Sequence, residues 1–171
     1  MKLLNPEGRE ASAGEPGELV AKGPNVMLGY YKDPQATGEA LKDGWLRTGD
    51  LAVQLPDGAY QIVGRAKEVI IRSGFNVYPP EVEAVLSSHP AVSQCAVVGR
   101  PTTDGDEEPV AFIAFIPGHA AEIDALKAHL TDRLAAYKRP ARYVVLPSLP
   151  ASPTGKILRR NLSELARDLP N

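Results

Sequence analysis

Four short motifs in this 171-residue sequence carry residue types that can bind or transfer a charged group. The last is Ser152-Pro-Thr-Gly-Lys156, in which a proline and a glycine shape a loop that presents Lys156 just ahead of an expected helix. A lysine ammonium on a long side chain can stabilise charge that builds on a phosphate. The loop is not a phosphate-cradling Walker loop, because Pro150 replaces the first glycine and Ile157 the final Ser or Thr. The motif predicts that Lys156 visits a phosphate and does not sit inside a cradle.

Two of the other motifs offer polar groups that suit hydroxyls or phosphate. Asp50 ends the run Trp45-Leu-Arg-Thr-Gly-Asp50, and a carboxylate at a strand start can accept from the paired hydroxyls of a ribose. Arg65 and Lys67 follow in Gly64-Arg-Ala-Lys67, where the forked donors of Arg65 suit hydroxyls or phosphate. Taken singly, these motifs favour the simpler interpretation, in which Asp50 ends a turn and Arg65 and Lys67 are solvated surface cations.

The remaining motif is Arg72-Ser-Gly-Phe-Asn-Val-Tyr-Pro-Pro-Glu-Val-Glu83. Gly74 has no side chain, so a backbone or a narrow ligand can approach it closely. The same glycine also suits a strand-to-helix turn that needs a positive φ, and both interpretations remain open at this point.

Composition limits the classes of function. The hydrophobic fraction is 43% and the net charge is -2, which predicts a packed core and argues against a protein that grips nucleic acid by bulk electrostatics. Cys95 is the one cysteine, so no internal disulfide can form, and its apolar neighbours predict a buried small hydrophobe. No apolar run approaches the ~20 residues of a membrane span, and neither end resembles a targeting signal. The cytoplasm is the expected location.

The elements that must position these motifs change character near residue 64. Before it, residues 1–15 are expected to be loop, followed by a short helix over 34–42 and strands over 18–21, 51–54 and 60–63. After it, we expect strands over 69–71, 92–98, 110–116 and 143–146, a turn over 73–76, an acidic loop over 102–108, and helices from Pro79, over 121–135 and over 158–169.

This order predicts an α+β fold: a compact carboxyl-terminal domain with a small sheet and flanking helices, preceded by a small all-β piece of a larger amino-terminal domain. The expected boundaries are residues 1–63 for the β-rich piece, 64–68 for a hinge and 69–171 for a mobile α+β domain.

Together, the four motifs resemble in order and spacing the adenylate-forming superfamily, which contains acyl-CoA synthetases, peptide-synthetase adenylation domains and luciferases. The resemblance runs from about Gly14 to Arg160 and includes Gly17-Glu-Leu-Val and Gly23-Pro-Asn-Val-Met-Leu-Gly-Tyr-Tyr31. The run from Arg65 to Glu83 and the run Tyr137-Lys-Arg-Pro140 are most similar to acyl-CoA or aryl-CoA ligases, since peptide-synthetase domains usually carry an aspartate at the hinge.

The resemblance implies a role for each motif. Asp50 would bind the ribose hydroxyls of ATP with help from Arg65, and Lys67 would be the hinge about which the carboxyl-terminal domain rotates. Lys156 would contact the substrate carboxylate and the α-phosphate while the acyl-adenylate forms. The stretch Gly74, Phe75 and Asn76 would line the path of the CoA pantetheine arm.

The resemblance also implies partners. They are a small carboxylic acid, ATP (released as AMP) and CoA, with Mg held mainly by a missing amino-terminal domain, which would supply the phosphate loop, the adenine contacts and the acyl pocket. The pattern Pro-x-x-x-x-Gly-Lys at Pro150 to Lys156 is that of bacterial ligases silenced by acetylation, which implies a protein lysine acetyltransferase at Lys156. No metal site is expected in this chain.

The expectation is therefore a carboxyl-terminal piece of an ATP-dependent acid–CoA ligase, inactive alone, present as a fragment, an expression product or a truncated gene product. Two alternatives stay open. One is an adenylating enzyme that loads a carrier-protein thiol, and the other is a non-catalytic module that binds a nucleotide or a protein partner.

Overall fold

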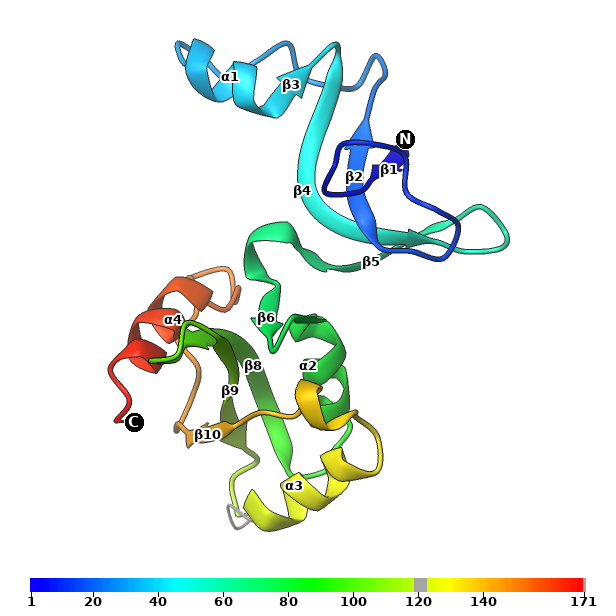
Figure 1. Cartoon of the computed structure of the whole chain (residues 1–171). Helices are drawn as coiled ribbons and strands as arrows, with labels where there is room; N and C mark the ends of the chain where they lie inside the picture. The colour runs from blue at the N-terminus through cyan, green and yellow to red at the C-terminus, as the bar shows by residue number, and fades with distance from the viewer. Residues whose placement is uncertain (119–122, 171) are drawn as a thin grey trace. The chain divides into compact units, whose positions relative to one another are not determined.

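A computed structural model describes residues 1–118 and 123–170 of the chain. The chain divides into two compact units, Met1–Lys67 and a second unit that begins at Glu68. Helices and small sheets occur together, which confirms the expected α+β class (Figure 1).

The first unit is a five-stranded antiparallel sheet in which the long strand β4 lies between β2 and β3 and also pairs with β5. Its elements are β1 (Lys2–Leu4), β2 (Gly17–Ala21), α1 (Pro34–Ala40), β3 (Leu41–Lys42), β4 (Trp45–Gln54) and β5 (Tyr60–Arg65). The strands expected over 51–54 and 60–63 are present and pair as an antiparallel hairpin, in whose turn Asp57 accepts a hydrogen bond from the amide of Ala59 at 3.0 Å.

Two expectations for this unit are wrong in detail. The stretch 1–15 was expected to be loop, but Lys2–Leu4 pairs with β2, and its Leu3 is buried. The short helix ends at Ala40 and not at Lys42, and residues 41 and 42 form a strand. Asp33 starts this helix by accepting the amide of Ala36 at 2.8 Å, a side-chain cap.

The second unit is built on a three-stranded sheet in the order β10-β9-β8, with β8 antiparallel and β10 parallel to β9. A separate two-stranded hairpin pairs β6 with β7. The strands are β6 (Ile70–Arg72), β7 (Phe75–Val77), β8 (Val92–Pro101), β9 (Glu107–Phe115) and β10 (Arg142–Val145). The helices are α2 (Pro79–Ser87), α3 (Ile123–Thr131) and α4 (Arg159–Arg167), with short 3-10 turns at η1 (Ala66–Glu68) and η2 (Ala136–Lys138).

The three-stranded sheet is buried on both faces. Along β8, Cys95 and Val97 join the apolar cluster that contains residues of α2 and α3, whereas Ala96 and Val98 join the cluster that contains residues of α4. Successive side chains of a strand point to opposite faces, so covering both faces explains why residues 95–98 form an unbroken apolar run within β8. The expectation of a buried Cys95 is confirmed.

The expected strand 69–71 and turn 73–76 need correction. Ile70 is buried, but Ile71 is 54% exposed, because β6 belongs to the two-stranded hairpin and not to the main sheet. The turn consists of Ser73 and Gly74 alone, with φ of 51° and 80°. Positive φ at both positions is what a type I′ hairpin turn requires. Phe75 and Asn76, expected in the turn, therefore lie in β7.

The expected helix over 121–135 is α3, which is described from Ile123 and ends at Thr131; positions 121 and 122 lie outside the described residues. Leu134 lies beyond the helix end but is still buried, because it packs in the cluster with Leu126 and Leu130.

Candidate functional site

Asp50 and Arg65 form a cross-strand pair on β4 and β5. The two residues lie opposite each other in the register, and Arg65 Nε is 2.8 Å from Asp50 Oδ1. The backbone of Asp50 is linked to the neighbouring strand β2 through Thr48. The amide of Asp50 donates to Thr48 Oγ1 at 3.0 Å, and that hydroxyl donates to Leu19 O at 2.7 Å. The side chains of Asp50 and Arg65 are 30% and 55% exposed, so a carboxylate and a guanidinium are presented together at the surface.

Lys67 lies in η1, the 3-10 turn that follows β5, and it is exposed. The boundary between the two compact units falls directly after it.

The Lys156 loop is held by its own backbone and by one hydroxyl. Ser152 donates its amide to Lys156 O at 2.8 Å, and the amide of Lys156 donates to Ser152 Oγ at 3.1 Å. Gly155 has a φ of 82°, a value that favours glycine, and an isolated bridge joins Ala151 to Ile157 across the loop. The Lys156 side chain is exposed, and within the described residues its ammonium has no ion-pair partner. The loop therefore holds the base of the lysine while its charged end stays available.

The hairpin that carries Gly74, Phe75 and Asn76 is exposed at its tip and anchored at its first strand. Ile71 donates its amide to Glu107 Oε2 at 2.8 Å. Arg72 Nη1 donates to the carbonyl oxygens of Tyr137 and Arg139, at 3.2 and 2.9 Å.

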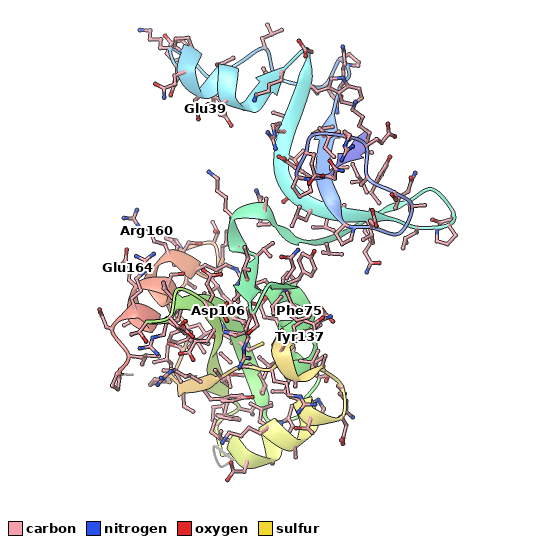
Figure 2. The ribbon with its side chains drawn as sticks, in the orientation of Figure 1. Glu39, Phe75, Asp106, Tyr137, Arg160 and Glu164 are labelled. Atoms are coloured by element: carbon pink, nitrogen blue, oxygen red, sulfur yellow. The ribbon has the colours of Figure 1, made fainter. Side chains whose placement is uncertain are left out.

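The Phe75 ring is 56% exposed and stacks on Tyr137, with 4.9 Å between the ring centroids (Figure 2). An aromatic face beside the open glycine Gly74, where a Cβ would meet nothing within 4 Å, suits a narrow and partly apolar chain.

The structure brings some of the expected residues together and leaves others apart. Asp50 touches Arg65, and the three hairpin residues share one turn and strand. Lys156 lies on a different loop of the second unit, and no hydrogen bond or ion pair between described residues joins it to the hairpin. Asp50 and Arg65 belong to the first unit.

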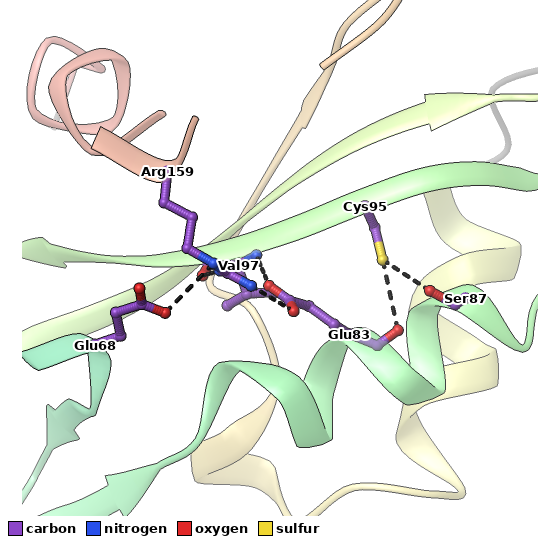
Figure 3. A network of polar contacts seen from close by, with 6 residues as sticks. All are labelled: Glu68, Glu83, Ser87, Cys95, Val97 and Arg159. Carbon is purple, nitrogen blue, oxygen red and sulfur yellow. Dashed lines mark hydrogen bonds and ion pairs between the residues drawn. The ribbon is translucent and has the colours of Figure 1, made fainter. Parts of the chain in front are cut away.

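Arg159 was not singled out from the sequence, although its guanidinium contacts Glu83, Val97 and Glu68 (Figure 3). Its Nη2 donates to Glu83 Oε2 at 2.7 Å, and its Nη1 donates to Val97 O at 3.0 Å. Its Nε lies 3.4 Å from Glu68 Oε2. Burial would lower the pKa of Arg159, but the hydrogen bond and charge of Glu83 and the charge of Glu68 outweigh it, so the pKa is raised. The sequence does place Arg159 three residues after Lys156. It does not reveal the partner of Arg159, because Glu83 is 76 residues away in the chain.

Cys95 lies at the edge of this network and contacts it through Glu83 (Figure 3). Its thiol contacts Ser87 Oγ at 3.2 Å and Glu83 O at 3.5 Å, and burial raises its pKa. A protonated, enclosed thiol is a poor nucleophile, which agrees with a packing role.

Over residues 1–118 and 123–170, no group of three or more His, Cys, Asp or Glu side chains is placed to hold a metal ion. None of the helices in the described part of the chain combines the length and the apolar character needed to cross a bilayer.

Residues 81–156 match the AMP-binding enzyme C-terminal domain family. The chain is 45% identical to a long-chain-fatty-acid–CoA ligase of Salmonella typhimurium over 97% of its own length and 29% of the ligase. It is 42% identical to a 2-succinylbenzoate–CoA ligase of Geobacillus kaustophilus, over 93% of the chain and 32% of that enzyme. The chain thus spans about a third of the length of these relatives.

The fold of the chain is also similar to part of a solved adenylate-forming enzyme. The anthranilate CoA ligase AuaEII, in complex with anthranoyl-AMP, superposes with a TM-score of 0.90 and 36% identity, over 97% of this chain and 33% of that one.

Proposed function

Because residues 81–156 of this chain are an AMP-binding enzyme C-terminal domain, we propose that the whole protein is an AMP-forming carboxylic acid–CoA ligase. The proposed reaction has two steps: a carboxylate attacks the α-phosphate of ATP and releases pyrophosphate, and the CoA thiol then displaces AMP from the acyl group. This chain supplies groups for both steps and is inactive without the rest of the protein.

One observation carries the proposal. The two ligases reported above act on a long-chain fatty acid and on 2-succinylbenzoate, yet the chain is about equally similar to both. Acids so different in size and charge cannot be recognised by the same groups. The shared region therefore fits the chemistry that both reactions have in common, which is the handling of the adenylate and of CoA.

Asp50 and Arg65 are the proposed ribose contacts. A carboxylate oxygen accepts hydrogen bonds from vicinal hydroxyls, and the Arg65 fork, 2.8 Å from the same carboxylate, holds it in place while keeping donors of its own. Both side chains are open to solvent, as a ligand contact requires.

Lys156 is the proposed adenylation lysine. Negative charge grows on the α-phosphate as the carboxylate attacks, and an ammonium at ~4 Å in an effective dielectric near 20 attracts it by roughly 4 kcal/mol before desolvation costs. The loop of Ser152 to Lys156 fixes the backbone of the lysine, and the free ammonium leaves its charge available for the reaction.

Lys67 is the proposed hinge, and the hairpin residues Gly74, Phe75 and Asn76 are the proposed pantetheine surface. The unit boundary directly after Lys67 supports the first role. The open turn at Gly74 and the exposed ring of Phe75 support the second. A rotation at Lys67 would let one domain deliver Lys156 for the first step and the hairpin for the second.

The substrates implied are ATP, CoA and a small carboxylic acid, and Mg would be held by the rest of the protein, since the described residues form no cluster for it. Transfer to a carrier-protein thiol remains the second candidate, because an exposed Phe75 serves a carrier-borne pantetheine as well as free CoA. The exposed ammonium of Lys156 also suits modification by a lysine acetyltransferase, which would remove the charge that the first step needs.

The test is thioester formation by the full-length protein with ATP, Mg and a panel of acids: a long-chain fatty acid, 2-succinylbenzoate and anthranilate. Free CoA and a pantetheinylated carrier protein are offered separately as acceptors. Acyl-CoA formation with AMP release supports the proposal. Acylation of the carrier protein without acyl-CoA formation supports the second candidate, an enzyme that loads a carrier-protein thiol. ATP binding without turnover on any acid contradicts both.

A further inference from the structure

Three parts of the second unit, one of them made of two elements, meet at the guanidinium of Arg159 (Figure 3). The first is the start of α4, which carries Arg159 itself, three positions after Lys156. The second is the core, through Glu83 of α2 and Val97 of β8, and the third is Glu68, the residue that follows Lys67.

The core side of this network is closed and rigid. Glu83 Oε2 accepts from Arg159 at 2.7 Å, and Glu83 Oε1 accepts the amide of Val97 at 2.7 Å. The carbonyl of the same Val97 accepts from Arg159 at 3.0 Å, so the three residues form a ring of hydrogen bonds. The Glu83 side chain is 16% exposed, and charge-assisted bonds in such a sheltered place are strong.

The start of α4 has no side-chain cap of its own. Its N-cap is Leu158, which makes no capping hydrogen bond, and an uncapped first turn is free to fray. Arg159, the first residue of the helix, cannot cap the amides of this turn, because a guanidinium only donates hydrogen bonds, but its side chain ties the start of the helix to the core. The same tie fixes the point at which the Lys156 loop ends.

We propose that Arg159 is a positioning residue for Lys156, and that its contact with Glu68 makes the Lys156 loop and the segment after Lys67 move as one body. This inference rests on the proposed role of Lys156 in adenylation. Arg159 does not touch the reacting atoms; it keeps Lys156 at a fixed place relative to the proposed hinge. A displacement of about 1 Å in a group that stabilises a transition state can cost on the order of a hundredfold in rate.

Arginine suits this role better than lysine would. Its planar fork presents separate donors to Glu83, Val97 and Glu68 at once, whereas a lysine ammonium at the end of a flexible stem would satisfy fewer of these partners in fixed directions. Among the described residues, the neighbouring Arg160 makes no such contacts: it is 91% exposed and pairs with Glu164 one turn away (Figure 2). It therefore provides a matched control.

The experiment measures both half-reactions of the full-length protein, with the acid that gives the highest turnover in the panel above. Adenylation is followed by acid-dependent ATP–pyrophosphate exchange, and transfer by acyl-CoA formation from supplied acyl-adenylate. The variants are Arg159→Met, Arg159→Lys, Glu68→Gln and Arg160→Met, each also made in a Lys156→Ala background.

We expect Arg159→Met to lower kcat for adenylation roughly tenfold to a hundredfold, with transfer changed less than about threefold. Arg159→Lys should recover part of the loss, Glu68→Gln should lose less than Arg159→Met, and Arg160→Met should match the parent. In the Lys156→Ala background Arg159→Met should cause no further loss, because the group that it positions is gone.

Losses that multiply in the Lys156→Ala background, or equal losses in both half-reactions, overturn the inference and leave the proposed role of Lys156 intact. Full activity of Arg159→Met also overturns it. If Lys156→Ala alone does not slow adenylation, the proposed function of Lys156 fails together with the inference. Should Arg159→Met lower the unfolding temperature too far for assay, Arg159→Lys and amide exchange across 151–157 decide: unchanged rate and unchanged exchange contradict the role.

Discussion

Asp106 accepts the backbone amide of Ser73 through both of its carboxylate oxygens, each at 2.8 Å. Ser73 also donates its hydroxyl to Asp106 Oδ2 at 3.1 Å. The acidic stretch between β8 and β9 therefore holds the turn of the β6–β7 hairpin, which carries the proposed pantetheine surface.

Replacement of Asp106 by Asn should loosen this hairpin. Hydrogen bonds from the amides of Ser73 and Glu107 hold the pKa of Asp106 below its ordinary value of 3.8. A group whose pKa is lower in the folded state stabilises the fold above its ordinary pKa, and this contribution disappears as the pH falls through the folded pKa. The variant should thus unfold more easily than the parent at pH 7, and the difference should vanish well below pH 3.8.

Thermal unfolding of both proteins from pH 7 to pH 2 checks this expectation. In the full-length enzyme the same variant should raise the KM for CoA and leave ATP–pyrophosphate exchange unchanged. An unchanged KM for CoA would contradict the link between this anchor and the thioester step.

Glu108→Gln should destabilise the second unit by about 3 kcal/mol, because the carboxylate is shared by Arg100, which is 5% exposed, and by Arg142. Burial raises the pKa of Glu108, but the hydrogen bonds from Arg100 and Arg142 outweigh this and lower it from its ordinary value of 4.5. Glu108 therefore contributes its full stabilisation of the fold above pH 4.5, and this stabilisation is lost as the pH falls through the lowered pKa. Urea unfolding at neutral pH measures it, with Glu164→Gln, which removes an exposed pair, as a control expected within about 0.5 kcal/mol of the parent.

Lys156→Ala in the full-length enzyme should slow adenylation on the order of a hundredfold or more, and transfer from supplied acyl-adenylate far less, since the lost charge serves the α-phosphate. Pyrophosphate exchange and single-turnover transfer measure the two steps. Lys127→Ala is the matched control, because Lys127 is an exposed lysine of α3 that pairs with Asp124. If the rates of adenylation and transfer fall equally, Lys156 has a structural role and does not act in adenylation.

Lys67→Pro should impede alternation between the two half-reactions. Proline fixes its own φ and restricts the residue before it, so the turn η1 loses the freedom that a hinge needs. Each half-reaction assayed alone should fall less than steady-state acyl-CoA formation. Lys67→Ala removes the ammonium but keeps the backbone free, and it should turn over like the parent; a slow Lys67→Ala would assign the effect to charge.

The sequence predicts those parts of the fold in which a pattern repeats locally. The apolar runs of β8 and β9 and the helical spacing of α2 and α3 needed no knowledge of their partners. β1 escaped prediction because three residues, of which only Leu3 is buried, carry no period. β7 escaped because Phe75 and Asn76 are exposed on a two-stranded hairpin, where no alternation of burial marks a strand.

The candidate site divides in the same way. Asp50, Arg65 and Lys156 stand in recognisable local motifs. The anchors of those motifs do not, because each is a contact between residues far apart in the chain. Arg159 donates a hydrogen bond to Glu83, which is 76 positions away in the chain. In the hairpin, Ser73 donates one to Asp106, which is 33 positions away.

The two apolar clusters of the second unit have a practical consequence. Both are drawn from residues between Ile70 and Leu169, so none of the side chains that build this core comes from the first unit. We therefore expect the second unit to keep these two clusters when the sequence before Lys67 is changed. If this expectation holds, the second unit can be joined as a cassette to the amino-terminal part of a relative without repacking these clusters.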